Sequence, residues 1–358
     1  MSIEGQKDPK PRCLVAFQCS QPTLPPIARS HISLAPLFLP SATEKISRRH
    51  MTSKAARAAD NDDDAFYQLE LTNWQRGVDA YSAGFGPLTS QSVPTLLEKG
   101  GFGHGNNSAA SQDAQHILLD VATGQGPVID AAISKARSTN IDAKFTALDF
   151  SSNFLQLAKK NLLASHPDTS IDWIEGDAQA MPFDNEAFTS VCCNFGILHL
   201  SDPDSFLSES YRVLKPGGRL AFSAWSAPPA TEGFGLIFGA VNDVGNPDVQ
   251  LPEGPPFFRF SNADEIQRSM EAVGFEDIDV TTVETMKWNN VGSADDLYEI
   301  LLEGTARTRE LLRAQTPEET AAIQKELKKR YLEITEGGSR PLRMPCVVSS
   351  GRKPLKES

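Results

Sequence analysis

Residues 116–133 read HILLDVATGQGPVIDAAI, and this stretch decides the fold. Residues 117–119 form a short apolar run of the kind found in a strand buried in a parallel sheet. Asp120 closes that strand, and two glycines in the following ATGQG turn let a backbone come close to a ligand. Pro127 suits the first turn of a helix, so the stretch predicts a strand, a glycine turn and a helix.

Several nucleotide-binding sites begin with a strand, a glycine turn and a helix. A P-loop requires Gly-Lys-Ser/Thr after the turn, and this turn lacks it. The dinucleotide site of an NAD-dependent oxidoreductase requires a third glycine, where Ile129 stands. What remains is an acid at the strand end followed by G-x-G. This pattern resembles motif I of the class I S-adenosylmethionine-dependent methyltransferases, except that Ala122 replaces the first glycine.

A second strand is expected over residues 144–148, ending at Asp149, and a helix capped by Ser151 should follow it. Asp149 comes 29 residues after Asp120, a spacing typical of a βαβ unit. A carboxylate at this second strand end can accept hydrogen bonds from both hydroxyls of a ribose. Asp149 is therefore predicted to hold the ribose of a nucleotide-like cofactor.

Three further stretches strengthen the resemblance. GDAQAMPF at residues 176–183 is similar to the segment with which these methyltransferases hold adenine, which implies that Asp177 accepts from the adenine amino group and that the Ala178 N–H meets a ring nitrogen. An apolar strand over residues 190–195 and the turn LKPGGRL at residues 214–220 follow in the family's order. The resemblance covers residues 115–226 and points to the ubiquinone/menaquinone-type small-molecule methyltransferases.

This resemblance implies a Rossmann-like, doubly wound α/β fold whose seven-stranded sheet is mostly parallel with an antiparallel last strand. It implies S-adenosylmethionine as cofactor and a small apolar or aromatic acceptor, such as a quinone-like or secondary metabolite. The implied cofactor-binding residues are Asp120, Ala122, Thr123, Gly124, Gly126, Asp149, Phe150, Asp177, Ala178, Asn194 and Phe195. The candidate acceptor-binding residues are Trp74, Tyr81, His199 and Trp225.

His199 is the candidate general base, because a histidine titrates in the useful pH range. Packing is the alternative role for this histidine, and also for Trp74 and Tyr81. Aromatic residues after residue 225, Phe234, Phe238, Phe257 and Phe258 among them, supply surface for an aromatic acceptor, although each is a core candidate on its own. A non-catalytic cofactor-binding or partner-binding protein on the same fold is the second function considered, and it rests on Ala122.

Three regions are expected along the chain. Residues 1–60, basic and rich in proline, should be disordered or a targeting segment, unless Met51 is the functional start. Residues 61–113 should form a helical cap, with one helix from about residue 65 and a second over residues 89–97. Residues 114–358 should form the core, with a helical lid inserted at about residues 293–335 that sets acceptor choice.

The C-terminal half gives more local expectations. A helix should cover residues 232–244, a second one should begin at a Ser261 cap, and a sixth strand should cover residues 277–288. Helices are expected over residues 293–303, 305–314 and 317–335. A last strand over residues 345–350 should run antiparallel to the sixth.

Composition narrows the function classes. A net charge of −12 argues against a general nucleic-acid binder, and no apolar run approaches the ~20 residues of a membrane span. The five cysteines show no C-x-x-C pair and no metal-ligand spacing, which favours a reduced cytoplasmic protein without a metal site. A mitochondrial location is the alternative if residues 1–50 act as a targeting segment.

Overall fold

The computed structural model describes residues 61–103 and 115–356. The expectations for residues 1–60 and for the last part of the cap, residues 104–113, lie outside this part of the chain. None of the helices that the structure describes is long and apolar enough to cross a membrane.

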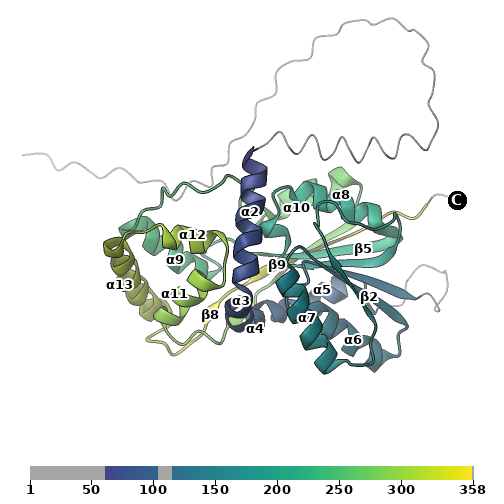
Figure 1. Cartoon of the computed structure of the whole chain (residues 1–358), viewed down its shortest axis with the longest axis horizontal. Helices are drawn as coiled ribbons and strands as arrows, with labels where there is room; N and C mark the ends of the chain where they lie inside the picture. The colour runs from purple at the N-terminus through teal and green to yellow at the C-terminus, as the bar shows by residue number, and fades with distance from the viewer. Residues whose placement is uncertain (1–60, 104–114, 357–358) are drawn as a thin grey trace, which may run out of the picture.

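A seven-stranded sheet forms the centre of the molecule, in the order β3-β2-β1-β4-β5-β9-β6 (Figure 1). The strands β1 to β5 pair in parallel, and β9 runs antiparallel to both β5 and β6. The predicted fold class is therefore confirmed. The strands are β1 His116–Val121, β2 Ala143–Asp149, β3 Ile171–Glu175, β4 Phe188–Asn194, β5 Leu214–Trp225, β6 Glu276–Val283 and β9 Cys346–Arg352.

Helices flank this sheet, and α7, α8 and α10 each begin at a residue whose side chain caps the first turn. Ser151 caps α7 as predicted, since its Oγ accepts from the N–H of Phe154 at 3.3 Å. The predicted Ser261 cap is wrong: Asn262, whose backbone is extended, caps α10 by accepting from two amides of the first turn, while Ser261 lies in the preceding turn η3. These elements are α6 Pro127–Thr139, α7 Ser152–Ser165, η2 Ile197–His199, α8 Pro203–Val213, η3 Arg259–Ser261 and α10 Ala263–Val273.

The helical cap precedes the sheet as α2 Asn61–Arg76, α3 Val78–Gly84, α4 Gly86–Thr89, η1 Ser90–Ser92 and α5 Val93–Lys99. Two glycines allow it to approach the rest of the molecule closely. A Cβ on Gly84 would lie 2.6 Å from the Ile300 side chain, and one on Gly86 would lie 2.2 Å from the Gln125 side chain. The cap is therefore packed against both the glycine turn and the C-terminal helices. In Figure 1, α2 lies between the central sheet and the group formed by α9, α11, α12 and α13.

A second group of helices contains α9 Glu232–Val244, α11 Ala294–Glu303, α12 Arg307–Arg313 and α13 Pro317–Ile334. The predicted sixth strand is too long, because β6 ends at Val283 and Trp288 belongs instead to a small ribbon of β7 Lys287–Trp288 with β8 Leu342–Arg343. Trp288 is fully buried and its Nε1 donates to the carbonyl of Gly84 at 2.9 Å. This bond ties the ribbon to the cap.

An ion pair network around one buried carboxylate joins the start of α9 to β8. Glu232 is 2 % exposed, and its carboxylate accepts from both Nη atoms of Arg340 at 2.9 and 3.0 Å and from Nε of Arg343 at 2.8 Å. Burial raises the pKa of this carboxyl, but the bonds from the two arginines lower it more, so the net pKa lies below the ordinary value. Its stabilising effect is therefore present near neutral pH and is lost as the pH falls.

We predict that the two sides of this network differ in their effect on stability. Replacing both Arg340 and Arg343 with Gln leaves a buried, uncompensated carboxylate and should lower the free energy of unfolding by about 3–5 kcal/mol. Glu232→Gln leaves two arginines that can be hydrated and should cost less, about 1.5–3 kcal/mol. Urea unfolding measures both changes. Lys329→Ala, on an exposed helical pair, is the control and should stay within about 0.5 kcal/mol. A larger loss from Glu232→Gln than from the double variant would contradict this reading.

The turn after β1 keeps the shape of a glycine turn although an alanine stands in it. Ala122 has a φ of 55°, and Gly124 and Gly126 also have positive φ. A left-handed conformation costs a residue with a Cβ about 1–2 kcal/mol. The extra methyl is accommodated because a glycine faces it: a Cβ on Gly196 would lie 2.5 Å from the Ala122 Cβ.

Ala122→Gly should therefore raise the free energy of unfolding by about 1 kcal/mol, since the relieved strain exceeds the added entropy of the unfolded chain. Ala131→Gly makes the same change within the right-handed helix α6 and should lower it by about 1 kcal/mol. Thermal or urea unfolding gives both values. Equal losses for the two variants would show that the turn is not strained at Ala122.

Candidate functional site

A cavity of about 360 Å³ lies beyond the carboxyl ends of the parallel strands. Its floor comes from the ends of β1, β2, β4 and β5, and its walls come from the cap, from residues 247–251 and from residues 304–308. Ligands in open α/β sheets bind at this edge. Most of the predicted site residues meet here: Trp74, Tyr81, Ala122, Gly124, Asp149, Phe150, Asp177, Ala178, Asn194, Phe195, His199 and Trp225 all line the cavity.

One end of the cavity is polar and is built around Asp149. This carboxylate is 4 % exposed and accepts from the N–H of Gly124 at 2.9 Å and from the N–H of Ser151 at 2.9 Å. Burial raises its pKa to about 6, and the backbone N–H bonds limit that rise. A Cβ on Gly124 would meet only the carbonyl of Ala122, at 4.0 Å, so open space lies over the turn beside this carboxylate.

Three predicted cofactor-binding residues, Asp120, Thr123 and Gly126, do not line the cavity. They lie on the side of the glycine turn that faces the protein interior. Asp120 is fully buried; its Oδ2 accepts from the Thr123 hydroxyl at 2.6 Å, and its Oδ1 has no hydrogen-bond partner among the described residues. Burial raises the pKa of Asp120 to about 8, so this carboxyl is mostly protonated at neutral pH. Gly126 faces α7, where a Cβ would lie 2.9 Å from Leu162.

The loop after β3 is fixed by a side chain that the sequence did not single out. Gln179 donates through its backbone N–H and its side-chain amide to Asp177 Oδ1, at 2.8 and 3.0 Å. Its Oε1 accepts from the Ser201 hydroxyl and from the N–H of Asp202, which follow η2. Asp177 and Ala178 are thereby held at the polar end of the cavity.

The end of β4 carries a strained backbone at the cavity floor. Phe195 has a φ of 59°, which is rare for a bulky residue and is concentrated at functional sites. Its N–H donates to the Ser223 hydroxyl at 2.9 Å, and that hydroxyl donates to Asn194 Oδ1 at 2.7 Å. The Phe195 ring lies 4.1 Å from the ring of Trp225. The bonds to Ser223 and Asn194 fix the Phe195 backbone, and the contact with Trp225 fixes its ring in the cavity floor.

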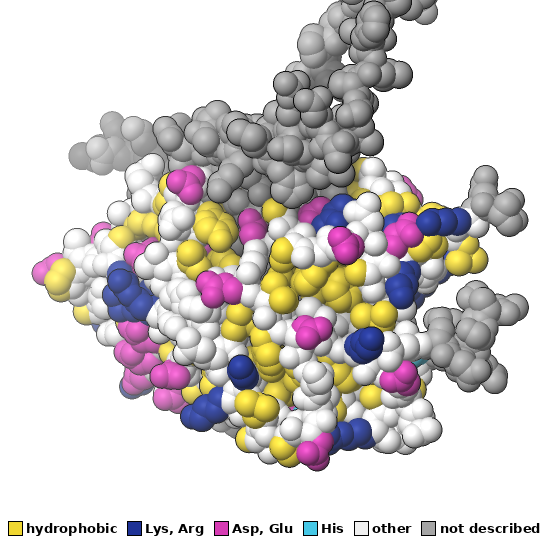
Figure 2. All heavy atoms as spheres, turned by 45° about the vertical axis from the view of Figure 1, so that its right-hand side comes forward, with side chains coloured by type: hydrophobic (Ala, Val, Ile, Leu, Met, Phe, Trp, Pro, Cys, Tyr) yellow, Lys and Arg dark blue, Asp and Glu magenta, His cyan; other side chains and the backbone are white. Residues whose placement is uncertain are grey.

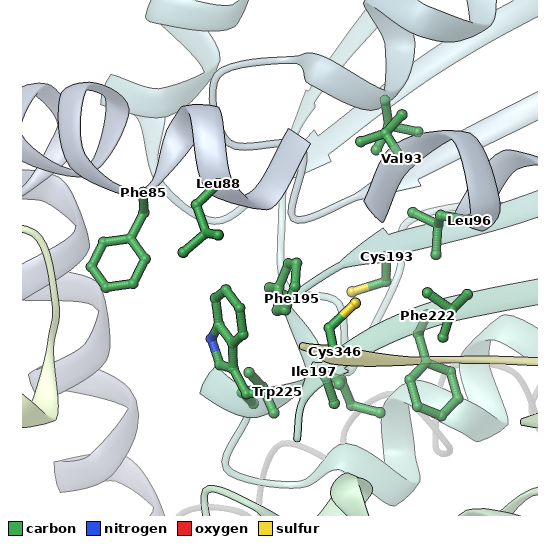
Figure 3. Close-up of a cluster of buried hydrophobic side chains, with 14 of the residues drawn as sticks. Phe85, Leu88, Val93, Leu96, Cys193, Phe195, Ile197, Phe222, Trp225 and Cys346 are labelled. Carbon is green, nitrogen blue, oxygen red and sulfur yellow. The ribbon is translucent and has the colours of Figure 1, made fainter. Parts of the chain in front are cut away.

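The other end of the cavity is aromatic. Phe234 from α9 contacts Trp225 at 5.6 Å between ring centroids, Phe238 at 5.9 Å and Phe257 at 5.7 Å. Figure 3 shows Phe85 of the cap and Phe195 on either side of Trp225, and the ring centroids of Phe85 and Trp225 lie 6.4 Å apart. Ring faces and edges therefore surround this end, as the aromatic composition of the C-terminal half suggested.

The predicted acceptor residues of the cap join His199 at one wall. The Trp74 ring lies 5.3 Å from Tyr81 and 4.7 Å from His199. A buried carboxylate that sequence reasoning missed, Glu70, lies between them: its Oε2 is 3.0 Å from His199 Nδ1 and accepts from Trp74 Nε1 at 2.8 Å. The sequence could have placed Glu70 near this wall, because Phe66, Glu70 and Trp74 are spaced by four and therefore share one helix face.

The inserted helices reach the cavity only through their middle portion. Residues 304–308 and Leu311 line it, whereas α13 packs on α9 and lines no part of it. Arg307 also escaped the sequence analysis. Its Nη1 donates to the carbonyl of Pro252 at 2.9 Å, its guanidinium lies 5.2 Å from the Phe66 ring centroid, and burial lowers its pKa.

Comparison with known proteins places the matched segment across this site. Residues 119–222 match the family model described as "Methyltransferase domain". A ubiquinone/menaquinone biosynthesis C-methyltransferase of Ruegeria sp. (strain TM1040) is 37 % identical over 112 residues, which are 31 % of this chain and 43 % of the relative. A demethylmenaquinone methyltransferase of Clavibacter sepedonicus is 33 % identical over 136 residues, 37 % of this chain and 52 % of the relative.

The chain thus spans about half the length of these relatives. A solved structure, phosphoethanolamine N-methyltransferase 2 of Haemonchus contortus in complex with S-adenosyl-L-methionine, aligns with a TM-score of 0.45 at 19 % identity, covering 83 % of this chain and 61 % of that one. Residues 119–222 are therefore similar to a methyltransferase domain, and over this segment the chain resembles the ubiquinone/menaquinone biosynthesis methyltransferases.

Proposed function

We propose that this protein transfers a methyl group from S-adenosylmethionine to a small apolar or aromatic molecule, with a quinone-like ring as the favoured acceptor class. The observation that carries the proposal is one cavity with two chemically different ends, one polar and one aromatic. The names of the matched relatives support the acceptor class.

The polar end suits the cofactor. The open space over Gly124 admits a ligand close to the turn, and Asp149 can accept from two ribose hydroxyls while keeping its bonds to backbone N–H groups. Asp177 and Ala178 are proposed to hold the adenine. When bound, S-adenosylmethionine supplies an electrophilic methyl group on a sulfonium. The chain then has to hold the acceptor in line and exclude water, and such alignment can lower a barrier by about 7–11 kcal/mol.

The aromatic end suits a planar acceptor, because aromatic rings contact one another favourably in stacked and edge-to-face arrangements. On the face in Figure 2, Lys and Arg side chains are dispersed among acidic and apolar ones, which supports a small molecule over a nucleic acid as substrate. The cysteines that the structure describes, Cys192, Cys193 and Cys346, are free and buried, which supports a cytoplasmic location.

Titration calorimetry with S-adenosylmethionine, followed by transfer of its labelled methyl group to a panel of hydroxylated aromatic and quinol-type molecules, tests the proposal. We expect binding and transfer to at least one of them. Binding without any transfer would favour a non-catalytic cofactor-binding protein. Absence of binding would refute the proposal and leave only a partner-binding protein on this fold.

Asp149 should make cofactor binding depend on pH. The carboxylate form is the one that accepts from two hydroxyls, so affinity should be constant above the pKa of about 6 and fall about tenfold per pH unit below it. Asp149→Asn should weaken binding by about 1–3 kcal/mol and remove most of this dependence. Asp172→Asn, an exposed acid on β3, is the matched control. Calorimetry between pH 5 and about pH 8 checks this, and a flat profile for the unaltered protein would contradict it.

Acceptor choice should depend on the aromatic end and on the part of the insertion that lines the cavity. Phe238→Ala and Leu311→Ala should each change the ratio of kcat/KM between two acceptors of different size by about 10–200-fold. Cofactor affinity should stay nearly unchanged. Leu332→Ala, at an exposed position of α13, is the control. If both cavity variants keep the acceptor profile of the unaltered protein, the insertion is only a structural support.

A further inference from the structure

Glu70 is a buried carboxylate that the methyl-transfer proposal does not yet use. It stands on α2, lines the cavity and is 1 % exposed. Its Oε2 contacts His199 Nδ1 at 3.0 Å and accepts from Trp74 Nε1 at 2.8 Å, whereas its Oε1 has no hydrogen-bond partner among the described residues. This contact joins the cap to the turn after β4, across 129 positions of sequence.

A packing role does not explain a carboxylate at this position. Removing a carboxylate from water costs several kcal/mol, and an amide would satisfy the Trp74 N–H without that cost. A carboxylate facing Nδ1 of a histidine does have a specific effect: it holds the proton on Nδ1, so that the lone pair of a neutral ring is on Nε2. The His199 side chain is 22 % exposed, and it lines the cavity.

Other charged or titratable groups face the same cavity and set the local field. They are Tyr67 and Tyr81 from the cap, Asp149 and Asp177 from the strand ends, Asp248 from the loop after α9, and Arg307 from α12. Phe257 and Trp74 contact the His199 ring at 6.0 and 4.7 Å between centroids. An acceptor beside His199 would therefore lie among aromatic rings.

We propose that Glu70 is a positioning residue that holds His199 as a proton acceptor, and that the methyl acceptor is a ring-bearing molecule with a phenolic or enolic hydroxyl. The proposal rests on the proposed function. The hydroxyl proton passes to His199 Nε2, the oxygen forms a bond to the methyl carbon, and the C–S bond of the donor breaks with its electron pair left on sulfur.

The choice of an imidazole as the base limits how weakly acidic the acceptor hydroxyl can be. Phenols have pKa values near ~10, within reach of an imidazole acting as a general base, whereas aliphatic alcohols are far less acidic. A positioned general base contributes about 10²–10⁴-fold in rate. The aromatic walls fit the flat ring that carries such a hydroxyl.

The test uses the full chain, labelled S-adenosylmethionine and a series of substituted phenols of graded acidity, assayed across pH. Glu70→Gln should lower kcat/KM for weakly acidic phenols at least about tenfold and have little effect on phenols that are already ionised. His199→Gln should show the same dependence on phenol acidity. Glu98→Gln, the same chemical change at an exposed position of α5, should leave all values unchanged.

A purely structural role would lower kcat/KM equally for every phenol, and that result would overturn the proposal. ¹⁵N NMR of His199 gives a readout that does not need an acceptor: we expect the proton on Nδ1 in the unaltered protein and loss of that preference in Glu70→Gln. A proton on Nε2, or cofactor binding with no phenol methylated, would also overturn it. Failure to bind S-adenosylmethionine at all would instead refute the proposed function.

Discussion

The parallel pairing of β1 with β2 on one side and with β4 on the other is the constraint on which the site depends. Asp120 pairs with Ala147 on β2 and with Cys192 on β4. Asp149, the last residue of β2, and Asn194, the last residue of β4, therefore each lie two residues further along the sheet than Asp120. Because all three strands point the same way, their carboxyl ends meet at one edge. Loops leaving that edge then place a carboxylate, a glycine turn and a strained Phe195 around one cavity.

The cap and the inserted helices depend on this edge in turn. The cap packs close to the turn because Gly86 leaves room for Gln125, and close to α11 because Gly84 leaves room for Ile300. The buried Glu232 with its two arginines joins α9 to the β7–β8 ribbon. The bond from Trp288 to Gly84 joins that ribbon to the cap. A cavity with one polar and one aromatic end results, since the strand ends supply carboxylates and the surrounding helices supply rings.

The sheet and the polar end could be predicted from the sequence because their signals are local: apolar runs, strand-end acids at regular spacing and glycine turns. Glu70 and Arg307 could not, since their roles depend on contacts across many residues, His199 and Pro252 respectively. The predicted cap Ser261 was wrong because Ser261 belongs to the preceding turn η3, so that the extended Asn262 caps α10 instead. Asp120, Thr123 and Gly126 belong to the motif but support it from below, which spacing alone does not distinguish from contact with a ligand.

We propose that the polar end of the cavity holds the cofactor and that the aromatic end holds the acceptor. A crystal structure of the full chain with S-adenosylhomocysteine, the demethylated product of the proposed reaction, tests this assignment most directly. It should show both ribose hydroxyls bonded to Asp149, the adenine beside Asp177 and Ala178, and the sulfur facing the Phe195 and His199 side of the cavity. A product bound with its adenine among Phe234, Phe238 and Phe257 would contradict the account.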